Sequence, residues 1–186
     1  MFSRLFRRGR RDDSTAPFLY GAIVASARTP ALYSEIGVPD TVNGRFEMVV
    51  LHMALVMRRL DPGGETARAT GQTVFDLFCR DMDNSLRELG VSDLKVPKRM
   101  RQVGEAYYGR VGAYEPGLTT GNADMLAGAI ARTVFAGEDS SRSAKALAAY
   151  TIAAADLLAA QDESEIVAAR PDFPDVGSLV EVGGTT

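Results

Sequence analysis

One histidine, His52, and one cysteine, Cys79, are present, and these residue types supply much of the metal-binding and nucleophilic chemistry of proteins. A single cysteine excludes an internal disulfide and a cysteine-rich zinc site, and a single histidine excludes any mechanism that needs two. Cys79 lies between Phe78 and Arg80, which favours a small buried apolar side chain over a reactive thiolate. A nucleophilic triad would therefore have to use both single residues.

Carboxylates are the remaining groups with acid–base or metal chemistry. Their spacing does not give the Glu-x-x-His pairs of di-iron helical bundles, and ion pairs on helix surfaces account for them. The candidates are Glu47, Asp81, Asp83 and Glu88. Neither a P-loop nor a G-x-G-x-x-G sequence occurs, so the usual phosphate-binding loops are absent. We predict a non-enzymatic protein with no catalytic residues, no metal site and no cofactor.

His52 lies in the most apolar segment of the chain, residues 45–60. Between Phe46 and Val56 only Glu47 and His52 are polar, which is typical of a helix covered on most sides. A lone histidine there is usually a hydrogen-bonded core residue. The alternative is a helical core that holds haem or a quinone-related ligand against His52, although the sequence has no haem-attachment motif and no second axial ligand.

Four cationic residues fall within seven positions at an expected helix start: Lys95, Lys98, Arg99 and Arg101. The helix dipole disfavours cations there by about 0.3–1 kcal/mol each, so the cluster indicates an anionic partner. Tyr107, Tyr108 and Arg110 follow, and aromatic residues with arginine are enriched in protein interfaces. We predict that these seven residues bind a partner. The alternative is an ordinary solvated basic face.

The first eleven residues are strongly basic, with five arginines. The whole chain has a net charge of −3, so residues 12–186 carry −8, which argues against binding DNA. Apolar side chains of the leader would share one face of a short helix, as in an interfacial anchor for anionic lipid. The predicted membrane-surface residues are Phe2, Arg4, Leu5, Phe6, Arg7, Arg8, Arg10 and Arg11. The alternatives are a solvated start and a short mitochondrial presequence.

In the elements that must position these residues, apolar side chains recur at helical spacing. No segment alternates apolar and polar residues over the length of a strand. Helices are expected to begin at Pro17 and at Thr29-Pro30, and three further helices are expected to cover 45–60, 65–89 and 140–161. Between the last two, one helix should run from about Pro97 to a loop at 115–117, and another from Asn122 to near Gly137. No run of 18 apolar residues occurs, so no membrane-spanning segment is expected. We predict an all-α, compact single-domain bundle of about six to eight helices over residues 16–174, with a basic leader (1–15) and a disordered tail (175–186).

Two blocks of sequence resemble the ubiquinol–cytochrome c chaperone family, which is known from mitochondria and alphaproteobacteria. Residues 19–60 contain, in the order of the family, Ala-Arg-x-Pro, Gly-Val-Pro-Asp-Thr, Gly-Arg-Phe-Glu, Leu-His and Arg-Arg-Leu. Residues 71–110 contain Phe-Asp-x-Phe, Asp-Met-Asp-x-x-Leu-Arg-Glu-x-Gly-Val, Ser-Asp-Leu and Tyr-Gly-Arg. The two blocks cover about half of the chain, whereas its C-terminal third matches only as alanine-rich helices.

The resemblance implies an assembly factor for the cytochrome bc1 complex (respiratory complex III). Mitochondrial members work with a small partner subunit near the ribosomal tunnel exit and bind newly made cytochrome b. The short leader favours a bacterial member that is cytoplasmic and peripheral on the inner face of the cytoplasmic membrane, or on the matrix side if eukaryotic. Leader and cation cluster would then contact anionic lipid, ribosomal RNA or acidic client loops. A membrane-surface adaptor with unrelated partners is a further alternative.

Overall fold

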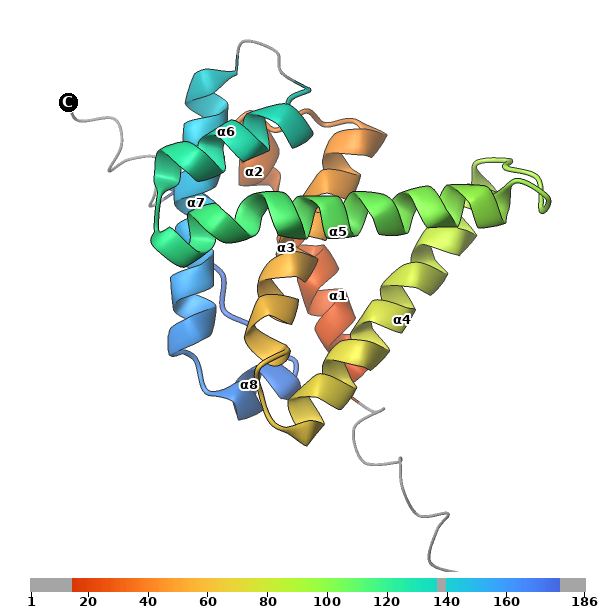
Figure 1. The fold of residues 1–186 in the computed structure, drawn as a ribbon, viewed down its shortest axis with the longest axis horizontal. Helices are drawn as coiled ribbons and strands as arrows, with labels where there is room; N and C mark the ends of the chain where they lie inside the picture. The colour runs from red at the N-terminus through yellow and green to blue at the C-terminus, as the bar shows by residue number, and fades with distance from the viewer. Residues whose placement is uncertain (1–14, 137–139, 178–186) are drawn as a thin grey trace, which may run out of the picture.

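The central helix of the fold is α3 (Val42–Leu60), which is buried along most of its length (Figure 1). Thr41 caps its start by accepting a hydrogen bond from the Gly44 backbone N–H at 3.1 Å. Helices α1 (Ala16–Ala27), α4 (Glu65–Glu88), α5 (Val96–Thr120) and α7 (Ser141–Ala160) all contact α3. A helix that is apolar nearly all round needs such cover, and the sequence-based placement of this segment at the centre is confirmed.

The structure, a computed structural model, describes residues 15–136 and 140–177. Three shorter helices complete it: α2 (Pro30–Ser34), α6 (Ala123–Thr133) and α8 (Glu163–Val167). Helix α6 packs between α5 and α7, and α8 packs against α4. The described residues form eight helices and no strand, so the all-α prediction is confirmed.

Two helix starts and one helix end lie where turn-forming residues predict them. Pro17 lies in the first turn of α1, and the Asn122 side chain caps α6 by accepting from the Met125 N–H at 2.9 Å. At the end of α4, Gly90 adopts φ +81°. The Val91 N–H then donates to the Leu86 carbonyl at 3.0 Å, which closes a Schellman cap and turns the chain toward α5.

The ends of α4 and α5 on either side of this turn converge and project beyond the other helices, at the right of Figure 1. We call residues 87–101 the arm tip. It consists of the last turn of α4, the connection, and the first turns of α5. Val96 is its buried residue, at 2% exposure, and Val91 is half-buried. The arm tip therefore has little core of its own and projects from the compact bundle that the other helices form.

The loop expected at residues 115–117 is wrong, because α5 runs through Pro116 to Thr120. Pro116 is exposed, so water can solvate the carbonyl that its missing N–H leaves without a helical donor. A Cβ on Gly117 would lie 2.8 Å from the Leu126 Cβ, so this glycine allows α5 to approach α6 closely. Helix packing therefore outweighs the local breakers, and Gly121, with φ +64°, ends the helix.

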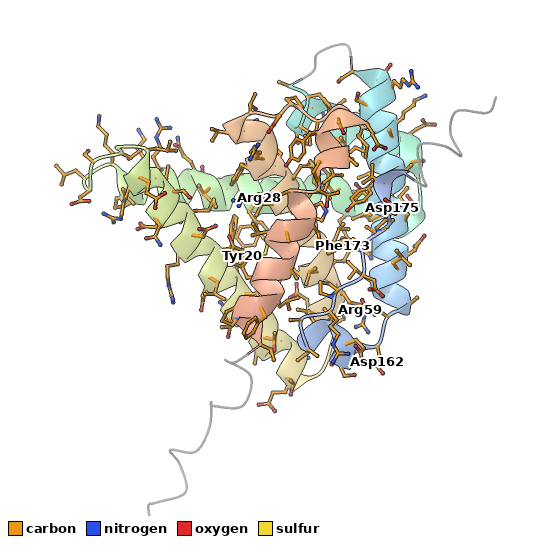
Figure 2. All side chains as sticks on the ribbon, turned by 180° about the vertical axis from the view of Figure 1, so that it is seen from behind. Tyr20, Arg28, Arg59, Asp162, Phe173 and Asp175 are labelled. Carbon is orange, nitrogen blue, oxygen red and sulfur yellow. The ribbon has the colours of Figure 1, made fainter. Side chains whose placement is uncertain are left out.

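The C-terminal part is more closely packed than expected. After α8 the chain returns between α1 and α7, with Phe173 along its course (Figure 2). The Phe173 ring lies 4.9 Å from the His52 ring, and Val176 is 2% exposed. Packing thus extends to Val176, inside the predicted tail. By length and composition alone, α7 could cross a membrane, but seven of its residues are buried, among them Leu147, Tyr150 and Leu158.

Candidate interaction surfaces

An apolar groove of about 570 Å³ opens between α1, α3, α4 and α5. Its wall is made by side chains that repeat at helical spacing on facing helices: Val42, Phe46, Val49, Met82, Leu86 and Leu89. Val42 and Leu89, at its mouth, are 73% and 67% exposed. Met82, Leu86 and Leu89 recur at helical spacing, as core-facing residues of a helix do, but the projection of the arm leaves Leu89 exposed. The groove is therefore an apolar surface that the described residues do not cover.

The rim of the groove carries one cation without an acidic partner. Arg45 pairs with Asp40 at 2.6 Å, and Asp81 accepts a hydrogen bond from the Tyr20 hydroxyl at 2.7 Å. Burial of the phenol, together with this hydrogen bond, raises the Tyr20 pKa. Arg28 is exposed at the end of α1 and has no acidic group within ion-pair distance among residues 15–136 and 140–177 (Figure 2). Two charged side chains that line the groove, Arg28 and Asp81, therefore have no ion-pair partner among the described residues.

The four predicted cations lie together on the arm tip, and all are exposed. Arg101 pairs with Glu105 at 2.9 Å, and Arg99 donates to the Gln102 side-chain oxygen at 3.0 Å. Neither Lys95 nor Lys98 has an acidic partner within ion-pair distance in the part of the chain that the structure describes. The cluster is a solvated cationic surface, and whether it binds a partner stays a prediction.

Tyr107 and Arg110 do not belong to that exposed surface, which corrects the sequence-based grouping. Successive helical residues point about 100° apart, so neighbouring tyrosines cannot share one face. Tyr107 is 4% exposed and lies 5.2 Å from the Phe75 ring, and burial raises its pKa. Tyr108 is 65% exposed but does not line the groove. Of the aromatic pair, Tyr108 alone is available to a partner.

Arg110 holds the one buried carboxylate of the described residues, Glu47. Two hydrogen bonds join them, Nε to Oε2 at 3.0 Å and Nη2 to Oε1 at 2.7 Å. The Glu47 side chain is 1% exposed and Arg110 is 26% exposed. This bidentate geometry compensates a carboxylate in the core and raises the Arg110 pKa. The sequence assigned Glu47 to a helix surface, and nothing in its local spacing marks a partner 63 residues away.

His52 is a core residue, as its position predicts. Its Nδ1 lies 2.8 Å from the Met48 carbonyl, and its Nε2 lies 2.8 Å from the Tyr150 hydroxyl. A carbonyl only accepts, so Nδ1 carries the proton and Nε2 accepts from Tyr150. Burial lowers the His52 pKa to about 4, which keeps the ring neutral. Both nitrogens are used, so no lone pair is left for haem, and the ligand-binding alternative gains no support.

The described residues contain no group of three or more His, Cys, Asp and Glu that could hold a metal. Cys79 is half-buried, and burial raises the pKa of its thiol, which works against a reactive thiolate. The apolar groove and the cationic arm tip are surfaces suited to recognition of a partner.

Two comparisons with known proteins agree with this picture. Residues 34–173 match the family described as ubiquinol-cytochrome C chaperone. The chain belongs to this family. A crystal structure of the Cbp3 homolog from Brucella abortus has the same fold, with a TM-score of 0.82 and 36% identity over 89% of this chain and 92% of that chain. No curated protein matches this chain significantly.

Membership confirms the resemblance and supports a chaperone role in bc1 assembly. It also agrees with a non-enzymatic protein, since chaperones act by binding. The matched segment contains α3, the groove-forming part of α4, the arm tip and all of α5. The predicted membrane-surface residues, Phe2 to Arg11, lie outside the described residues, and their role stays a prediction.

Proposed function

We propose that this chaperone binds newly made cytochrome b and holds one of its apolar segments in the groove between α1, α3, α4 and α5. The observation that supports this most directly is the uncovered apolar wall of the groove, on a protein of the ubiquinol–cytochrome c chaperone family. A membrane subunit without its partners exposes apolar helix surface that must be shielded from water. Helices commonly dock by laying an apolar face into such a groove.

The charge at the rim favours one kind of client segment. Arg28 and Asp81 both line the groove and lack ion-pair partners among the described residues, so a client segment with an acidic residue near Arg28 and a basic residue near Asp81 would match their charges. The exposed groove-mouth residues Val42 and Leu89 would be covered on binding. The acidic body of the chaperone favours protein over nucleic acid as the client.

The proposed client is a membrane subunit, so the location that fits it is the membrane surface. We propose that the protein is peripheral on the inner face of the cytoplasmic membrane, with the basic leader on anionic lipid. A small partner subunit and a contact near the ribosomal tunnel exit belong to the same proposal. They rest on the resemblance to mitochondrial members.

The test is crosslinking and pull-down of the tagged full chain from detergent-solubilised native membranes, with mass spectrometry of the partners. Cytochrome b should be enriched, and Val42→Asp should reduce its recovery several-fold, because a carboxylate in an apolar contact must be desolvated. The matched control is Phe18→Asp, since both side chains are 73% exposed and Phe18 lies outside the groove. Recovery unchanged by Val42→Asp would place the client elsewhere. Background levels of cytochrome b with a functional tagged protein would refute the client itself.

A further inference from the structure

The arm tip combines an exposed leucine with cations that the described fold leaves unpaired. Leu94 is 95% exposed, the highest value among the large apolar side chains in residues 15–136 and 140–177. Lys95 follows it directly, and Lys98 lies three residues further on. Full exposure of a leucine at the end of a projecting element has no packing explanation within the described structure.

The turn does not require these side chains. Gly90 and the Schellman hydrogen bonds set its backbone, and Val96 supplies its buried contact. The Lys95 N–H donates to the Ser92 carbonyl at 2.7 Å, which any residue type at position 95 except proline would allow. Leu94, Lys95 and Lys98 are therefore free to act on something outside the chain.

The charge of the arm tip is positive although the body is acidic. Residues 87–101 contain five cationic and two acidic side chains. One of the acids, Asp93, is bound by Arg87, which also pairs with Asp83 at 2.6 Å. A projecting, cationic surface with a leucine among the cations matches the needs of a bilayer interface, where apolar groups enter the acyl boundary and cations meet anionic headgroups. Ribosomal RNA would use the cations and leave Leu94 without a role.

We propose that the arm tip is an anionic-membrane contact in which Leu94 enters the interface and Lys95, Lys98 and Arg99 lie on the headgroups. The tip projects beyond the other helices, so a flat surface can reach it without meeting the body (Figure 1). The inference rests on the membrane-surface setting of the proposed function, but it is independent of the client and of the leader.

The first experiment is flotation of the full chain with phosphatidylcholine vesicles, with and without phosphatidylglycerol. Lys95→Glu/Lys98→Glu should lower binding to the anionic vesicles by about 30-fold or more, and Leu94→Ser should lower it by about tenfold. The matched control, Arg142→Glu/Lys145→Glu, makes the same charge change at exposed positions of α7 and should have much less effect. Equal losses in the two charge-reversed variants would overturn the proposal, because net charge alone would then explain binding.

A second measurement separates the tip from the leader. The sequence has no tryptophan, so Leu94→Trp introduces a single tryptophan at the tip, which can be excited selectively over the tyrosines. Its emission should shift to the blue on anionic vesicles, whereas Leu157→Trp, on α7 at 42% exposure in the native chain, should show no shift. A protein that floats without a shift at position 94 is held by its leader, and the proposal fails. RNA binding lost on reversal of Lys95 and Lys98, with vesicle binding unaffected by Leu94→Ser, would also overturn it. None of these readouts involves cytochrome b, so client capture can fail or succeed separately.

Discussion

The body half of α5 and the arm tip both contain cationic side chains, but in opposite surroundings. In the half that crosses the body, Arg110 is bidentate to Glu47, and the Tyr114 hydroxyl lies 2.8 Å from Thr133 Oγ1. In the arm tip, Lys98 at the start of α5 and Lys95 just before it have no acidic partner among the described residues, and Leu94 is 95% exposed. Contacts within the chain account for Arg110 and Tyr114, whereas no contact among the described residues accounts for Leu94, Lys95 and Lys98. A functional surface is therefore better located by the partners that side chains lack than by the side chains themselves.

The largest loss of stability is expected when the partner of the buried carboxylate is removed. Arg110→Met leaves Glu47, at 1% exposure, without a compensating charge. Loss of one member of a buried ion pair typically costs about 3–5 kcal/mol, so the free energy of unfolding should fall by that amount. Urea denaturation followed by circular dichroism measures it.

Two controls sharpen the result. Arg101→Met breaks a pair whose side chains are 82% and 62% exposed, and it should leave the unfolding midpoint unchanged. The double variant Glu47→Leu/Arg110→Met should recover most of the lost stability, because no charge is left buried. A double variant as unstable as Arg110→Met would mean that packing by the arginine stem, not charge, is the main contribution.

The next largest effect on stability concerns His52, whose burial keeps the ring neutral. Its pKa is about 4 in the folded protein against an ordinary value of 6.5. The unfolded chain therefore binds more protons between these values, and stability should fall as pH decreases from 6.5 toward 4. Between pH 7.5 and pH 5 the loss should be about 2 kcal/mol, measured by urea denaturation at each pH.

The control for this pH dependence is His52→Gln, which lacks the titrating ring. Asp40 and Asp162 also have lowered pKa values, caused mainly by hydrogen bonds from Arg45 and from Ser164. Their stabilisation is lost only as pH falls below their ordinary value of 3.8, outside the window. A pH slope in His52→Gln as steep as in the native chain would show that another group is responsible.

The sequence predicts the helices well where local signals and tertiary packing agree. Pro17, Asn122 and the apolar 45–60 segment mark their elements correctly. The prediction fails at residues 115–117, because Pro116 and Gly117 are strong breakers locally while the close approach of α5 to α6 is a tertiary contact. A breaker pattern cannot reveal that a distant helix will pack against it.

For the candidate surfaces, the sequence shows which charged residues lie close together along the chain. It does not show which residues will pair across the fold. The cations at 95–101 are contiguous, so the arm tip collects them whatever the tertiary fold. Tyr107 and Arg110 were assigned by adjacency, but helical geometry turns Tyr107 inward and a glutamate on α3 binds Arg110. The groove needs four helices to be placed, so no local pattern could predict it.

The groove and the arm tip share Leu89, which lines the first and belongs to the second. If the arm tip contacts lipid, Leu89 brings one end of the groove close to the membrane surface, where an apolar client segment would emerge. The two proposals therefore support each other in geometry while remaining separable by experiment. Vesicle binding tests the arm tip without a client, and pull-down from detergent tests the groove without a bilayer.

The smallest expected effect on stability is at Leu94, and it tests whether this residue has a structural role in the arm tip. Leu94→Ala should change the free energy of unfolding by less than about 0.5 kcal/mol, because the side chain contacts little in the described structure. The same truncation at Leu126, which is 0% exposed and packs against Gly117, should cost about 2–5 kcal/mol. Thermal or urea unfolding of the two variants measures the contrast. A Leu94→Ala variant as unstable as Leu126→Ala would give Leu94 a structural role and remove the main observation behind the membrane contact.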